Sequence, residues 1–288
     1  MPPIRRRDCR GAPSFVVDEG AYCWLSGQWK ELGKVRFVIV HYHLYKNAGT
    51  TVDDVLARNF PEHERGTIEG EYPWSEVSPA ALLDYALANP NLRVISSHQA
   101  RLPLPEHPDI TFLPILFLRH PIDRFGSVYR FERQQELASP TATSRAARNS
   151  SMSAFAEWVV SREANAVCRN FQVLILAAGL REIVESRATP SDYQGALLRL
   201  KSLPFFGLVE AFDASLQRLQ DHLRPYFGEI DVNYQTLNVS ADSTSTLEAR
   251  LQDTERELGP LLYRELVECN ALDLLLYRDA HELFVGTR

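Results

Sequence analysis

Short apolar runs recur along the chain, with longer amphipathic segments between them. Four runs predict β-strands, because they are rich in β-branched and aromatic residues and apolar at successive positions. They are residues 35–40 (VRFVIV), 93–97 (RVISS), 111–119 (TFLPILFLR) and 204–209 (PFFGLV). Strands that are apolar on both faces are buried between layers, as in parallel sheets. The pattern therefore predicts an α/β protein of three layers, with a central parallel sheet flanked by helices.

Helix signals lie between the strand runs. Residues 78–91 (SPAALLDYALANPN) begin with Ser78 as an N-cap and Pro79 at the first helical position, which predicts a crossover helix. A second helix is predicted behind Pro121, where apolar residues recur at helical spacing. The polar, aperiodic residues 138–153 predict a mobile loop or a short linker, and the leucine-rich C-terminal third predicts mainly helices.

Composition limits the classes of protein to which the chain can belong. Its 288 residues, 45% of them apolar, are enough for one large α/β domain. We expect an N-terminal extension over 1–34 and a single domain over 35–288. Because the net charge is −6, we do not expect nucleic acid as a partner. No run of about 18 apolar residues is present, and no apolar stretch follows the basic start, so we expect no transmembrane segment and a cytoplasmic protein.

The four cysteines, Cys9, Cys23, Cys168 and Cys269, are far apart and have neither CxxC spacing nor a nearby pair of histidines. This arrangement does not indicate a zinc site, and we expect neither metal nor disulfides. Free thiols fit a reducing, cytoplasmic setting.

The run at 35–40 leads into a loop with the chemistry of an anion site. Its sequence, HYHLYKNAGTTVDD, precedes a predicted helix that starts at about Thr51. N–H groups at a helix start are unpaired and carry partial positive charge, a lysine adds a full charge, and threonine hydroxyls add donors. Small residues allow close approach of a ligand. The predicted binding residues are Lys46, Asn47, Ala48, Gly49, Thr50 and Thr51.

The order of residues in this loop differs from a Walker A loop. There the lysine follows the last glycine, whereas Lys46 comes three residues before Gly49. The alternative to an anion site is a plain surface turn with an incidental lysine.

A second segment, FLRHPIDRFGSVYRF (residues 117–131), favours the anion site. It places Arg119 at the carboxyl end of a predicted strand and Ser127 two helical turns further along, with Arg124 between them. Ligands of open α/β sheets bind at the carboxyl ends of strands, so Arg119 and Lys46 can face one crevice and hold two anionic groups of one ligand. The alternative is that these arginines pair with surface acids.

These two segments resemble the nucleotide-binding motifs of sulfotransferases that use 3′-phosphoadenosine 5′-phosphosulfate (PAPS). HLYKNAGTT is similar to their 5′-phosphosulfate loop, of the type H-x-P-K-T-G-G-T, although Tyr45 replaces the proline. Residues 117–131 are similar to their 3′-phosphate motif, of the type F-L-R-D-P-x-x-R-x-x-S-x-Y. Further similar segments follow the order of the branch that contains the heparan-sulfate 2-O and 6-O enzymes and their bacterial relatives. They are 94–102, 170–179, 205–219 and 270–284.

The resemblance implies a P-loop-like fold and a sulfotransferase that moves a sulfuryl group from PAPS to a hydroxyl of an acceptor, a carbohydrate or a small molecule, without a metal. It implies that Lys46 contacts the bridging oxygen of the leaving phosphate and that residues 47–51 wrap the 5′-phosphate. It also implies that Arg119 and Ser127 hold the 3′-phosphate. The stretch after Asn238 lacks the basic residues that some relatives place over the nucleotide.

For the general base we select His98, which follows the run at 93–97 and so emerges at the same sheet edge as Lys46. In the resembling enzymes a histidine of this segment takes the proton of the acceptor hydroxyl. The alternative is a capping or core histidine. His43 is interpreted as a packing or orienting residue and His41 as a weaker candidate for the base; His120 stands where many relatives have aspartate.

Two other functions compete with sulfuryl transfer. One is a P-loop nucleotide kinase-like phosphotransferase that uses ATP and magnesium, which the position of the lysine disfavours. The other is a catalytically inactive nucleotide-binding protein of the same fold.

Overall fold

The structure is a computed structural model that describes residues 22–25, 28–31, 35–72, 75–135, 141–161, 164, 166–177, 187–234 and 246–286. Its main sheet has five strands, all parallel, in the order β4-β5-β3-β6-β7. The strands are β3 (Arg36–Tyr42), β4 (Arg65–Thr67), β5 (Val94–Ser97), β6 (Ile110–Leu118) and β7 (Gly207–Leu208). Strands β1 (Tyr22–Leu25) and β2 (Gln28–Glu31) form a separate antiparallel pair within the predicted N-terminal extension.

Helices surround the main sheet, and three 3₁₀ turns connect elements in the part of the chain that the structure describes. The helices are α1 (Gly49–Asn59), α2 (Pro79–Ala88), α3 (Pro121–Arg133), α4 (Ala142–Ala147), α5 (Met152–Val160), α6 (Phe171–Ala177), α7 (Pro190–Ser202), α8 (Phe212–Phe227), α9 (Leu247–Leu258), α10 (Pro260–Cys269) and α11 (Ala271–Gly286). The 3₁₀ turns are η1 (Glu62–Glu64), η2 (Ala166–Cys168) and η3 (Val209–Ala211).

The sheet separates two apolar cores, because successive residues of β3 point to opposite faces. Val38 and Val40 lie in a core with side chains of α2, α6, α7 and α11. Ile39 lies in the other core, with side chains of α1 and α8. The three-layer α/β fold predicted from the sequence is therefore confirmed.

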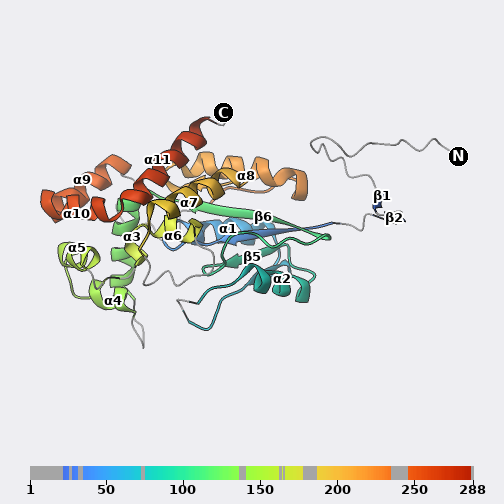
Figure 1. Cartoon of the computed structure of the whole chain (residues 1–288), viewed down its shortest axis with the longest axis horizontal. Coiled ribbons are helices and arrows are strands. Elements are labelled where there is room, and N and C mark those ends of the chain that lie inside the picture. Colours follow the sequence, from blue (N-terminus) through green and yellow to red (C-terminus); the bar gives the residue numbers. More distant parts are fainter. Residues whose placement is uncertain are drawn as a thin grey trace.

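A third core lies beyond the carboxyl ends of the strands. There α3, α4, α5, α9 and α10 gather at one end of the molecule (Figure 1), around buried Phe125 and Phe155. This group of helices places α3 and α9 beside the end of the sheet at which parallel strands present their ligand sites.

All four predicted strand runs contain strands, but two local predictions were wrong. Residues 138–153 are not a loop throughout, because α4 and the start of α5 lie within the described part of this segment. The Thr141 side chain accepts a hydrogen bond from Ser144 N, and Ser151 accepts one from Ala154 N, so each short helix is capped. Helix α1 begins at Gly49 and not at Thr51.

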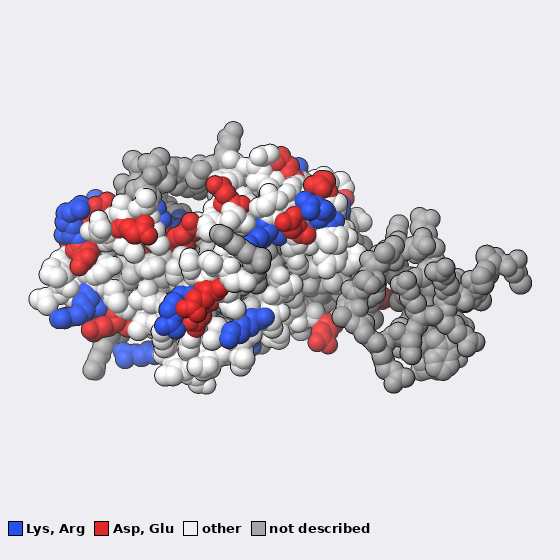
Figure 2. All heavy atoms as spheres, turned by 90° about the horizontal axis from the view of Figure 1, so that it is seen from above, with Lys and Arg blue, Asp and Glu red and all other residues white. Residues whose placement is uncertain are grey.

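Charged side chains of both signs are interspersed over the face of the molecule that Figure 2 shows. No helix within the described ranges is both long and apolar enough to cross a membrane. Cys168 and Cys269 are free thiols; Cys9 and the side chain of Cys23 lie outside the described residues.

Candidate functional site

The loop between β3 and α1 has a strained backbone and a set of unpaired donors. Lys46 and Ala48 have φ angles of 63° and 61°, in the left-handed region that costs a residue with a side chain about 1–3 kcal/mol. Ala48 is the N-cap of α1 and has no side-chain cap. Within the described ranges, the N–H groups of Ala48, Gly49 and Thr50 have no hydrogen-bond partner. Unpaired N–H groups at a helix start are the donors that the predicted anion site requires.

The side chain of Asn47 points into the protein and does not face the proposed phosphate site that the resemblance implies for residues 47–51. The side chain is buried, and its Nδ2 donates to Phe117 O at 2.7 Å and to Gln172 Oε1 at 2.8 Å. It therefore fastens the loop to β6 and α6, and the Asn47 backbone N–H is engaged as well, since it donates to Leu44 O at 3.1 Å. The Gln172 amide also bonds both N–H and C=O of Arg119, at 2.9 Å each. Gln172 was missed as a site residue, although it lies in a segment that resembles the family.

Arg119 and Lys46 do come together. Arg119 Nη1 donates to the backbone carbonyl of Lys46 at 3.1 Å, and its Nε donates to Asp123 Oδ2 at 2.8 Å. Arg250 from α9 binds the same carboxylate at 2.7 Å. Burial alone would raise the pKa of Asp123, but Arg119 and Arg250 outweigh it and lower this pKa. Arg119 thus pairs with an acid, but a buried one that fixes its guanidinium beside the loop.

Lys46 is partly buried and surrounded by other cations. Its Nζ lies 4.1 Å from the centre of the Phe131 ring. Burial, with the charges of Arg119 and Arg130, lowers the pKa of Lys46 to about 8, and Glu132 opposes this shift. A bound anion would relieve the repulsion between these cations.

Helix α3 adds further groups on the same side. Ser127 lies one turn after Asp123, is half-buried, and has no hydrogen bond to its hydroxyl from any described residue. Arg130 folds back along the helix, because a Cβ at Gly126 would lie 3.3 Å from its Nη1. Arg124 instead points inward: it is fully buried and donates to the carbonyls of Tyr45 and Val167.

Arg130 and Arg250 were not identified as site residues from the sequence. Arg250 lies just beyond the stretch after Asn238 that lacks basic residues, most of which is outside the described residues. Because α9 brings Arg250 to Asp123, 127 residues away in sequence, no local pattern signals it.

Three histidines form a second cluster at the ends of β3 and β5. His41 and His43 donate through Nδ1–H to the carboxylate of Asp53, at 2.7 and 2.9 Å, and Ser96 Oγ donates to it at 2.5 Å. Burial would raise the pKa of Asp53, but these hydrogen bonds hold it below its usual range. Burial also lowers the pKa of His43, against the effect of Asp53.

His98 is stacked on this cluster. Its ring centre lies 3.9 Å from that of His43, and its Nδ1 lies 2.9 Å from Glu69 Oε1. The same carboxylate oxygen accepts from the His98 backbone N–H. The side chain is 53% exposed, so His98 is not a core histidine. A carboxylate that accepts from Nδ1–H fixes the tautomer in which Nε2 can accept a proton.

Gly49 connects the histidines to the anion loop. The φ angle of Gly49 is not positive, so glycine is needed here for its small size and not for its conformational freedom. A Cβ at this position would lie 2.0 Å from His43 Cδ2. The imidazole of His43 therefore packs directly on the first residue of α1.

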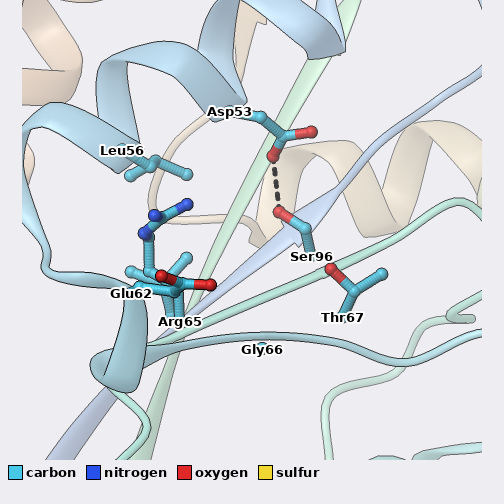
Figure 3. Close-up of a pocket in the computed structure, with 8 residues that line it drawn as sticks. Asp53, Leu56, Glu62, Arg65, Gly66, Thr67 and Ser96 are labelled. Carbon is cyan, nitrogen blue, oxygen red and sulfur yellow. Dashed lines mark hydrogen bonds between the residues drawn. The ribbon is translucent and has the colours of Figure 1, made fainter.

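A pocket of about 250 Å³ lies beside the histidines, between α1 and the edge strand β4 (Figure 3). Asp53 and Ser96 line one end of it. The other lining residues are Leu56, Glu62, Arg65, Gly66, Thr67 and Val94.

No family model matches the chain. A protein of Archaeoglobus fulgidus, described as uncharacterized, is 31% identical over 255 residues, which are 86% of this chain and 98% of the archaeal protein. The chain belongs to the same family as this protein. The similarity extends over almost the whole length of the archaeal protein. The functional inference therefore rests on the geometry of the site.

We expect Gly49→Ala to displace His43 and to lower the free energy of unfolding by about 1–3 kcal/mol, as overpacking does. Urea denaturation measures this change. Gly195→Ala is the matched control, because a Cβ at this position would meet Ala177 at an ordinary contact distance of 3.9 Å. This substitution also removes a glycine from the interior of α7. It should raise stability by about 0.5–1 kcal/mol. Equal stability of the two variants would contradict the close contact between Gly49 and His43.

Proposed function

We propose that the protein is a PAPS-dependent sulfotransferase that transfers a sulfuryl group to a hydroxyl of an acceptor, a carbohydrate or a small molecule. The observation that carries the proposal is the hydrogen bond between Arg119 and the backbone of Lys46. It joins the end of β6 to the anion loop, so that a 3′-phosphate and a 5′-phosphosulfate can be held by one cationic site.

The 5′-phosphosulfate would bind at the start of α1, on the free N–H groups of residues 48–50. Lys46 would neutralise the charge that grows on the leaving phosphate, which is electrostatic catalysis of the oxyanion-hole kind. In this step the bond from sulfur to the phosphate oxygen breaks, and its electron pair stays on the phosphate. A new bond forms between sulfur and the acceptor oxygen.

The proton of the acceptor hydroxyl would go to His98 Nε2. The contact of Nδ1 with Glu69 at 2.9 Å supports this role, because it orients the ring and leaves Nε2 as the acceptor. His98 follows β5, whereas Lys46 and Arg119 follow β3 and β6, so His98 could approach the sulfur from the acceptor side. The ring of His43, which stacks on that of His98, would help to hold His98 in this orientation.

The kinase alternative needs a carboxylate at a strand end to hold magnesium beside the loop. The residues that directly follow the strands next to the loop are instead His43, His98 and Arg119. This set of groups favours phosphosulfate over a metal-bound triphosphate. The inactive alternative is disfavoured because the groups needed for binding and for proton transfer occur together.

Titration calorimetry should show tighter binding of adenosine 3′,5′-bisphosphate than of AMP or ATP. The 3′-phosphate contacts of Arg119 and Ser127 should contribute roughly 1.5–3 kcal/mol, on the order of tenfold to a hundredfold in affinity. Ser127→Ala should weaken the bisphosphate and leave AMP unchanged. Equal affinity for AMP, or binding of ATP that requires magnesium, would overturn the assignment of the donor.

The lowered pKa of Lys46 predicts a pH dependence. Since only the protonated amine attracts phosphate, affinity for adenosine 3′,5′-bisphosphate should fall as pH rises through about 8. Lys46→Arg keeps its charge throughout this range, so its affinity should stay constant between pH 7 and pH 9. If the two proteins lost affinity in parallel, another group would be responsible.

Removal of the proposed base should abolish turnover but not donor binding. His98→Ala should lower kcat by about a hundredfold to ten-thousandfold and remove the acidic limb of the pH–rate profile. Glu69→Gln should lower kcat by about tenfold to a hundredfold, since the ring loses its partner. The readout is transfer of radiolabelled sulfate to a panel of glycans and phenols.

Glu71→Gln is the control for these variants, because Glu71 is a nearby exposed acid. It should retain full activity. A His98→Ala variant with near-full activity and an unchanged pH profile would exclude His98 as the base.

A further inference from the structure

We propose that His41, His43 and Asp53 form a binding site for a divalent first-row transition metal ion, with Zn²⁺ as the best match. His41 is in β3 and His43 is the residue directly after the end of this strand, and both rings point toward α1, where they contact Asp53. Asp53 on α1 lies opposite them. One ligand atom of each residue lies within 4.8 Å of the others.

The donor atoms select the class of ion. Two imidazole nitrogens and one carboxylate form the ligand set of many zinc and non-haem iron centres, whereas Mg²⁺ and Ca²⁺ prefer oxygen ligands. Three protein ligands leave at least one coordination position for water. The site differs in this respect from a closed structural zinc site, which has four protein ligands.

The distances are close to those that an ion requires. Nδ1 of His41 lies 2.7 Å from Oδ1 of Asp53, and Nδ1 of His43 lies 2.9 Å from Oδ2, the other oxygen of the same carboxylate. Ligands of a tetrahedral zinc ion with bonds of about 2.0 Å lie about 3.3 Å apart, so the atoms would separate by about half an ångström. The carboxylate can make this shift, because the Asp53 side chain is 36% exposed, whereas His41 is almost completely buried. The ion would take the place of the shared protons, and each imidazole would carry its proton on Nε2.

The surroundings supply the other features of a metal site. Ser96 Oγ donates to Asp53 at 2.5 Å and orients the carboxylate, as outer hydrogen bonds do in metal centres. The pocket between α1 and β4 opens on Asp53 and Ser96 (Figure 3). It offers a route for the ion and room for water ligands.

An ion here would join β3 to α1 and fix the ring of His43. That ring contacts Gly49 on one side and stacks on His98 on the other. The site is thus placed to stabilise the junction between the anion loop and the histidines. The sulfuryl transfer proposed above uses no metal, and the two proposals are independent.

The test uses the full chain after treatment with a chelator. Calorimetric titration with Zn²⁺ should give one ion per chain at this site and a raised melting temperature, since a ligand that binds the folded state stabilises it. Co²⁺ should bind there with a visible absorption band that Zn²⁺ removes. Mg²⁺ and Ca²⁺ should bind much more weakly.

Matched variants locate the ion. Asp53→Asn and His43→Gln should each weaken Zn²⁺ binding by at least about tenfold and abolish the Co²⁺ band. Asp54→Asn is the control, because Asp54 is the next residue of α1 and its carboxylate pairs with Arg58 and with no other residue of the described ranges; it should bind like the wild type.

Unchanged affinity in Asp53→Asn, or no Co²⁺ band in the wild type, would overturn the proposal and leave the cluster as a hydrogen-bond network. Circular dichroism verifies that each variant is folded. If His43→Gln does not fold, Asp53→Asn alone decides, because the Asp53 side chain is 36% exposed. Neither readout uses PAPS, so a negative result would leave the proposed transferase activity standing.

Discussion

The buried amide of Gln172 is the interaction on which the arrangement of the site depends. It accepts from Asn47 in the anion loop and bonds both backbone groups of Arg119 at the end of β6. Its own backbone N–H and that of Val173 donate to Asp273, a fully buried acid of α11 whose pKa is raised by burial. Buried polar groups are costly unless they are paired, so each member of this network constrains the position of the next. Helices α6 and α11, which carry Gln172 and Asp273, therefore fix the position of the anion loop relative to the segment that follows β6.

Much of the fold could be predicted from the sequence because local patterns, such as apolar runs and helix caps, indicate the strands and helices. Buried strands appear as continuous apolar runs, and α2 has its Ser78 cap and its Pro79 in the expected places. Strand β4 was missed because it has only three residues, Arg65–Thr67, and no apolar run. Helix α4 was missed because six residues are too few for a periodic signal, and packing on neighbouring helices supplies the stability that its sequence lacks.

The site was predictable only in part, for a related reason. Lys46, Arg119 and Ser127 lie in contiguous motifs, and the structure places the first two together as the motifs suggest. Their partners come from elsewhere in the chain. Glu69 reaches His98 across 29 residues and Gln172 reaches Asn47 across 125, and no spacing rule connects such positions. The sequence also gave no reason to expect that the imidazoles of His41, His43 and His98 would stack, since that depends on the registration of β3 with β5.

Because Gly49 and His43 are in close contact, the residue types that these two positions can accept depend on each other. Only a hydrogen atom at residue 49 leaves room for the imidazole, so a larger side chain there is compatible only with a smaller one at residue 43. Loss of that imidazole would in turn remove a partner of Asp53 and the surface on which His98 stacks. A larger side chain at residue 49 would thus have to be accepted together with a rearranged cluster of histidines.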